Sequence, residues 1–100
     1  MGIYKEVVDR IYELCNEREI TPNALSYLAG ISQSTIKSIL NGESRNPGIV
    51  TIKKICDGLD ISIIEFFDTE NFKDLEQEIK WEQVYFFFYS RIIDKHYAFV

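Results

Sequence analysis

The chain has 100 residues, of which 46% are hydrophobic and 27% are charged. These values fit one compact domain, and they exclude a disordered tail, a fibrous repeat and two independent cores. The N-terminal region has Glu6 and Asp9 where a signal peptide would be apolar, and no apolar stretch reaches the roughly 20 residues that span a bilayer. We therefore expect a soluble, cytoplasmic protein.

Residues that carry enzyme or metal chemistry are scarce. Cys15 and Cys56 lie far apart without a CxxC pair, which supports neither a disulfide scaffold nor a closed zinc site. Both fall on apolar stripes, and we interpret them as small core residues. The single histidine, His96, is interpreted as a tail residue without a catalytic role. With no glycine-rich phosphate loop and no HExxH motif, the sequence predicts no enzyme activity, no cofactor and no bound metal.

The net charge of −5 is distributed unevenly along the chain. Residues 20–56 carry a charge of +3, with Glu43 as their only acid, whereas residues 57–70 carry −5 and no basic side chain. Because the local charge matters more than the total for attracting phosphate, the acidic composition does not exclude a nucleic-acid partner.

Helical periodicity begins close to the N-terminus. Apolar residues recur at helical spacing from Tyr4 to Cys15, which predicts an amphipathic helix over residues 3–17. Thr21 and Pro22 fit the N-cap and first position of a second helix, where the missing N–H of proline costs nothing. Gly30 is the expected end of this helix, because glycine adopts a left-handed backbone without a Cβ clash.

A third helix is predicted to begin only two residues after that glycine. Ser32 is the expected N-cap, Ile36, Ile39 and Leu40 form the buried stripe, and Gly42 is the expected end. Two short helices joined by so tight a turn form a helix-turn-helix, in which the second helix is held at a steep angle and projects from the body.

Two further helices complete the expected body. After a polar loop over residues 43–48, a fourth helix is indicated by apolar residues at helical spacing, namely Ile49, Ile52, Ile55, Cys56 and Leu59. Ser62 and Glu65 fit a capping box for a short fifth helix that carries Phe66 and Phe67. Residues 1–67 are therefore expected to be all helical.

Three stretches of the chain resemble the Cro/phage-repressor-like, or XRE, family of helix-turn-helix transcriptional regulators. They are ITPNALSYLAGISQSTIKSILNG at 20–42, NP at 46–47 and IKKICDGLDIS at 52–62. The resemblance implies an all-α fold with a five-helix lambda-repressor-like DNA-binding domain over residues 1–70. The change of composition after that point indicates an aromatic-rich C-terminal extension over residues 71–100. The resemblance also implies a protein that acts as a dimer on an operator with two-fold symmetry.

The resemblance further indicates which residues face DNA. A helix over residues 33–42 would enter the major groove and present residues near its N-terminus to the base edges. The base-reading candidates are Gln33, Ser34, Lys37 and Ser38, since glutamine can pair with adenine and lysine with guanine. The candidates for phosphate contacts are Thr21, Asn23, Thr35, Asn41, Ser44, Arg45, Asn46 and Lys53, with Lys54 as an alternative to Lys53.

Some residues depart from the family pattern. Pro22 stands where the family commonly has a glutamine that clamps a phosphate, so this anchor is either lost or passed to Asn23. Lys37 and Leu40 replace a common serine and a common polar residue, and the base specificity of relatives therefore does not transfer. The alternative interpretation of the base-reading candidates is an ordinary solvated helix face, and for Arg45 it is a solvated loop charge.

The last twenty residues hold eight of the fourteen aromatic residues. The run VYFFFY at 84–89 is apolar on both faces as a strand and all round as a helix, so periodicity does not decide between them. An exposed run of this kind indicates a protein interface or an aggregation hazard, and we favour the interface. We expect dimerisation either through a helix from about residue 71 to 93 or through a β-ribbon, using Trp81, Val84, Tyr85, Phe88 and Ile92. Packing against its own domain, or an origin in read-through, would leave the tail without that role.

Two functions follow from these observations. The first is a sequence-specific DNA-binding regulator that reads the major groove as a dimer. The second is a protein-interaction module, such as an antitoxin or an accessory regulator, that keeps the helix-turn-helix scaffold and holds a protein partner with its hydrophobic tail. The acidic total and Pro22 favour the second function slightly.

Overall fold

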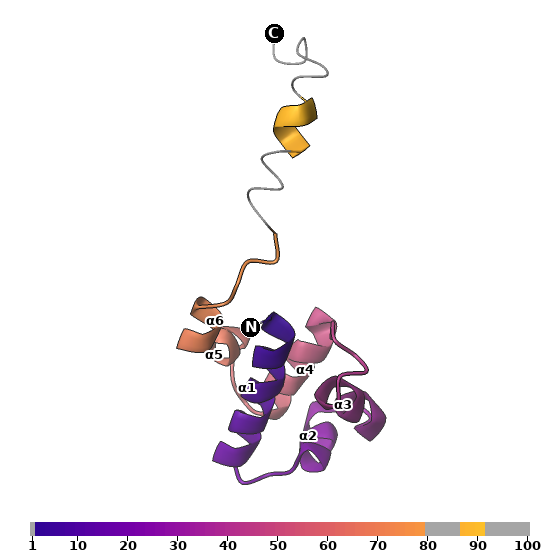
Figure 1. Cartoon of the computed structure of the whole chain (residues 1–100). Helices are drawn as coiled ribbons and strands as arrows, with labels where there is room; N and C mark the ends of the chain where they lie inside the picture. The colour runs from indigo at the N-terminus through magenta and orange to yellow at the C-terminus, as the bar shows by residue number, and fades with distance from the viewer. Residues whose placement is uncertain (1, 80–86, 92–100) are drawn as a thin grey trace.

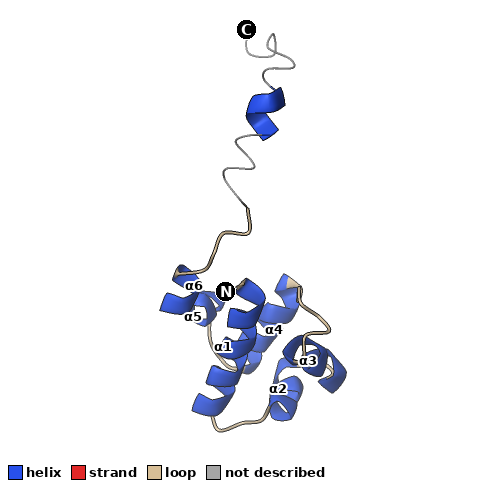
Figure 2. Ribbon diagram, viewed as in Figure 1, coloured by secondary structure: helices blue, strands red, loops and turns tan. Residues whose placement is uncertain are grey.

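The computed structural model describes residues 2–79 and 87–91 of the chain. Within these residues the regular structure is helical (Figures 1 and 2). The labelled elements are α1 (Ile3–Glu17), α2 (Pro22–Ala29), α3 (Gln33–Leu40), α4 (Ile49–Gly58), α5 (Ile63–Phe67) and α6 (Glu70–Lys73). The expected all-α fold is confirmed, and the bounds of the first two predicted helices match α1 and α2.

The helix ends follow from local chemistry. The Thr21 hydroxyl accepts a hydrogen bond from the Ala24 N–H at 3.1 Å, and Ser32 accepts from the Thr35 N–H at 3.2 Å, so both predicted N-caps are confirmed. Gly30 ends α2 in the left-handed conformation with φ +65°. The third helix ends at Leu40, two residues earlier than predicted, because Asn41 already leaves the helical conformation before the left-handed Gly42.

The core joins α1, α2, α3, α4 and α5. Its most deeply buried side chains include Ile11, Leu25, Ile39, Ile55 and Phe66, none more than 1% exposed. Burying a side chain of this size contributes about 1.5–3 kcal/mol. Ile39, together with the buried Ile36, holds α3 against the body in this way. Cys15 and Cys56 are also buried, which confirms their interpretation as core residues.

Two predictions about burial and helix number are corrected. Ile49, expected in the buried stripe of the fourth helix, is 75% exposed because it is the first residue of α4 and lies at the edge of the core. A sixth helix was not expected. Thr69 caps it by accepting from the Phe72 N–H at 3.3 Å, and the Phe72 ring packs against Phe66 and Phe67. The packed body therefore extends to Lys73.

The prediction of one helix from about residue 71 to 93 is wrong. The chain leaves the helical conformation at Asp74, and residues 75–79 are not helical. Leu75 and Ile79 are too few apolar residues to hold a helix against the body, and an isolated helix is marginal in water. Residues 87–91 form one helical turn that includes Phe88, so this part is no strand. Four residues of the predicted dimer interface lie outside the described residues, namely Trp81, Val84, Tyr85 and Ile92. His96 lies outside them as well.

Candidate nucleic-acid interface

The turn between α2 and α3 is held by backbone hydrogen bonds around Gly30. The Ile31 N–H donates to the Ser26 carbonyl at 3.0 Å, which closes the end of α2 and sends the chain directly into α3. The Ser26 side chain is buried, and its hydroxyl donates to the Asn23 carbonyl at 2.6 Å. Because Ile36 and Ile39 face the core, the opposite polar face of α3 is exposed to solvent.

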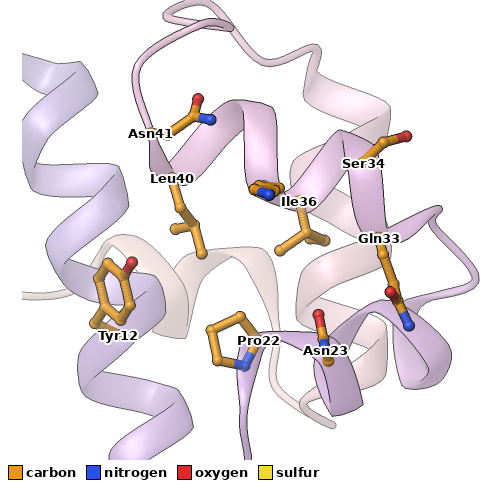
Figure 3. Close-up of a pocket in the computed structure, with 9 residues that line it drawn as sticks. Tyr12, Pro22, Asn23, Gln33, Ser34, Ile36, Leu40 and Asn41 are labelled. Carbon is orange, nitrogen blue, oxygen red and sulfur yellow. The ribbon is translucent and has the colours of Figure 1, made fainter.

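A groove of about 560 Å³ lies between the start of α2 and the polar face of α3 (Figure 3). Its apolar floor consists of Pro22, Ile36 and Leu40, with Tyr12 contributed by α1. The polar residues around it all belong to the predicted DNA-contacting set: Asn23, Gln33, Ser34, Lys37 and Asn41. The fold thus gathers three of the four base-reading candidates and two of the phosphate candidates on one surface.

The base-reading candidates differ in how free their side chains are. Gln33 donates from Nε2 to the Tyr27 hydroxyl at 3.3 Å, and Ser34 shares a hydrogen bond with Ser32 at 3.1 Å. The exposed Lys37 forms no ion pair with any described residue. Ser38 is half-buried outside the groove, where its hydroxyl donates to the Glu43 carboxylate at 3.3 Å.

Tyr27 is a residue of this surface that sequence reasoning missed. It lies near the end of α2, is 77% exposed, and its hydroxyl contacts the amide of Gln33. An exposed aromatic residue at the end of the first helix of a helix-turn-helix was the available signal. Its phenol can orient the glutamine amide and can itself hydrogen-bond to a phosphate.

Several phosphate candidates already use their side chains within the protein. The Thr21 hydroxyl caps α2, and the Thr35 hydroxyl bonds to Ser32 at 2.8 Å. Ser44 lies in the loop after α3, where its N–H donates to the Ser38 carbonyl at 2.9 Å. Asn46 is exposed in the same loop.

The two cationic phosphate candidates differ in charge compensation. Arg45 donates from Nε to the Gly42 carbonyl at 3.2 Å and lies 5.9 Å from the centre of the Tyr4 ring. Lys53 forms an ion pair with Asp57, which raises the pKa of its ammonium group through that hydrogen bond. Arg45 therefore keeps its charge available at the loop, whereas the charge of Lys53 is partly compensated.

Acidic residues are concentrated away from α3. In Figure 1, α5 and α6 lie on the opposite side of the molecule from α3, and they or their ends carry Glu65, Asp68 and Glu70. Within the described ranges, no group of three histidine, cysteine or acidic side chains is arranged to hold a metal ion. No helix in that part of the chain is long and apolar enough to cross a membrane.

A tight two-helix unit with its second helix anchored by apolar residues and its polar face in solvent defines a helix-turn-helix protein. The family model described as the Cro/C1-type HTH DNA-binding domain matches residues 10–71, and the chain belongs to this family of non-enzymatic DNA-binding regulators. The resemblance drawn from residues 20–62 is thereby confirmed.

A solved structure agrees with this assignment. The crystal structure of the prophage Lp1 protein 11 is similar to 75% of this chain and 100% of its own, with 34% identity and a TM-score of 0.66. A search of curated proteins finds no match.

Proposed function

We propose that the protein is a cytoplasmic, sequence-specific transcriptional regulator that places α3 in the major groove of a palindromic operator. The observation that carries this proposal is the surface formed by Asn23, Gln33, Ser34, Lys37 and Asn41, which combines uncharged hydrogen-bonding groups with a cation that has no ion-pair partner among the described residues. Groups of this kind suit base edges and phosphates at the same time.

The proposed roles follow from the side chains. Gln33 has both a donor and an acceptor and can pair with adenine, while Lys37 can donate to the acceptors of guanine. A serine hydroxyl can donate or accept, so Ser34 and Ser38 discriminate between bases only where a neighbouring group fixes the direction of their hydrogen bond. Asn23, Asn41 and Arg45 would hold phosphates on either side of α3, and these contacts position the protein without selecting a sequence.

Dimerisation through the C-terminal extension is the second part of the proposal. The helical turn over residues 87–91 exposes Phe87, Phe88 and Tyr89, an apolar surface that a second subunit would cover. Two copies on a palindrome would need their α3 helices about 34–36 Å apart, one turn of DNA. Sedimentation of the full chain should show a dimer, and Phe88→Ser should shift it toward the monomer; a wild-type monomer at high concentration would refute this part.

The deciding experiment is selection of bound duplexes from a random pool at physiological salt. A palindromic motif is expected, and the affinity for it should fall by about 0.9 log unit per log unit of salt for each phosphate contact. Gln33→Ala and Lys37→Ala should each weaken binding by about five- to 150-fold, the equivalent of about 1–3 kcal/mol. The matched controls Gln77→Ala and Lys5→Ala change exposed residues away from the groove and should bind normally.

A protein-interaction module is the second candidate function, and one observation favours it. An apolar groove of about 420 Å³ lies between the start of α1, the loop before α4 and α5, and Ile3, Ile49, Ile63 and Phe67 are among its lining residues. If the duplex selection enriches no motif, and if the affinity for duplex DNA does not change with salt, these results would favour this function over the first.

A further inference from the structure

Glu43 is the one acidic residue in the basic segment 20–56, and it lies beside the DNA-reading helix. One carboxylate oxygen accepts from the Ser38 hydroxyl at 3.3 Å, and the other accepts from the Asn41 amide nitrogen at 3.2 Å. The Glu43 N–H in turn donates to the Asn41 side-chain oxygen at 3.1 Å. A single carboxylate thus holds one base-reading candidate and one phosphate candidate.

The loop keeps this carboxylate in place. The Ser44 N–H donates to the Ser38 carbonyl at 2.9 Å, and Arg45 Nε donates to the Gly42 carbonyl at 3.2 Å. Gly42 adopts a φ of +89°, a backbone conformation that suits glycine and turns the chain back toward the end of α3. Glu43 therefore sits on a closed turn beside Ser38 and Asn41.

These hydrogen bonds decide what Ser38 can offer to DNA. A serine hydroxyl has one proton and two lone pairs, and the Ser38 hydroxyl uses its proton in the hydrogen bond that it donates to Glu43. Ser38 can then only accept a hydrogen bond from a base. In the major groove the groups that donate are the amino groups of adenine and cytosine. The carboxylate of Glu43 is also an acceptor and favours the same amino groups.

The negative charge has a second effect, on all DNA. A carboxylate near the phosphate backbone repels it, and this repulsion acts on every sequence alike. An amino group that donates to Ser38 offsets the repulsion, whereas a keto oxygen at the same position adds to it. The charge therefore weakens binding to unselected DNA more than binding to the selected site.

We propose that Glu43 is a specificity-determining residue, which fixes Ser38 as a hydrogen-bond acceptor and makes the protein require adenine or cytosine at the base that Ser38 faces. This inference depends on the proposed function, since it assumes that α3 reads the major groove. The Glu43 carboxylate has two effects: it sets the base preference through the Ser38 hydroxyl, and it lowers the affinity for unselected DNA through its charge.

The test compares Glu43→Ala with Glu65→Ala, which removes an equal charge from α5 on the far side of the molecule. Duplex selection and binding to an unselected duplex are measured for both full-length variants, and thermal melting verifies that each is folded. We expect Glu43→Ala to bind the unselected duplex about three- to fivefold more tightly and to lose the adenine or cytosine preference at one position in each half-site, because alanine removes both the charge and the acceptor of the Ser38 hydrogen bond. Glu65→Ala should retain the motif and the wild-type affinities.

A third variant separates the hydroxyl from the charge. Ser38→Ala should lose the preference at the same position without the gain in affinity for unselected DNA. A Glu43→Ala variant that selects the wild-type motif would overturn the inference and leave the proposed function standing, as would a Ser38→Ala variant that keeps the preference. A wild-type protein that selects no motif at all would overturn both.

Discussion

The hydroxyl of Tyr4, in the first turn of α1, donates a hydrogen bond of 2.5 Å to the backbone carbonyl of Ile39, in the last turn of α3. The last four carbonyls of a helix have no partner within the helix, and Tyr4 satisfies one of them from 35 residues away. The Tyr4 ring also lies under the Arg45 guanidinium. The C-terminal end of α3 is thus attached to α1 through one aromatic side chain.

Tyr4→Phe should lower the free energy of unfolding by about 1–2 kcal/mol, because the partly buried Ile39 carbonyl loses its donor while the ring remains. Urea denaturation measures the change. The control is Tyr12→Phe in the same helix, whose hydroxyl makes no hydrogen bond to the described residues and whose loss should cost less than about 0.5 kcal/mol. Equal stabilities of the two variants would show that the Tyr4 hydrogen bond contributes nothing.

Gly58→Ala should destabilise the fold by about 1–3 kcal/mol, despite the better helix propensity of alanine. A Cβ atom at Gly58 would lie 2.8 Å from the Ala29 nitrogen and 2.9 Å from the Leu28 carbonyl carbon, so the backbones of α2 and α4 would have to separate. Thermal melting detects the loss. Lys54→Ala, at an exposed position of the same helix, is the control and should melt like the wild type; a stable Gly58→Ala would disprove the close packing.

Arg45→Ala should weaken binding to all duplexes alike and lower the slope of log affinity against log salt by about 0.9, the value of one phosphate contact. Lys53→Ala removes the same charge from α4, but Asp57 already partly compensates it, so a smaller change is expected. Titrations at four or more salt concentrations measure both slopes. The prediction fails if Lys53→Ala reduces the slope more than Arg45→Ala does.

The stability of the fold should fall at alkaline pH because of its two buried thiols. Burial raises the pKa of Cys15 and of Cys56, so in the folded state both keep their protons at a pH where the unfolded chain has lost them. The free energy of unfolding should be constant up to the ordinary thiol pKa of about 8.5 and then decrease, by at most about 1.4 kcal/mol per pH unit for each thiol. Chemical denaturation between pH 7 and 9.5 gives this curve. Cys56→Ala should reduce the slope of the free energy of unfolding against pH. An unchanged slope would show that the Cys56 thiol does not cause the loss of stability.

The sequence predicted the helix-turn-helix well because its ends are encoded locally. Thr21, Pro22, Gly30 and Ser32 each fix a helix end through their own backbone or side chain, whatever the rest of the chain does. The error at Ile49 has a different origin. Its position on the helix is right, but the core ends before it, and the extent of a core depends on all the elements together.

The contacts of Glu43 lay beyond sequence reasoning. They join residues on both sides of a turn whose conformation depends on Gly42 and on the bonds of its neighbours. The short α6 was accessible in principle, since Thr69 is a cap residue and Phe72 follows three positions later. It was overlooked because four helical residues give no measurable periodicity.

The separation of charge across the molecule affects more than the final complex. Among the described residues, Lys37 on α3 and Arg45 in the loop after it lie away from the acids around α5 and α6, so positive and negative charges are separated across the helical body. In the field of a polyanion such a molecule rotates before it touches, so the productive orientation is overrepresented among collisions. For a DNA-binding protein with a net charge of −5, this separation would favour an approach to DNA through the side of α3.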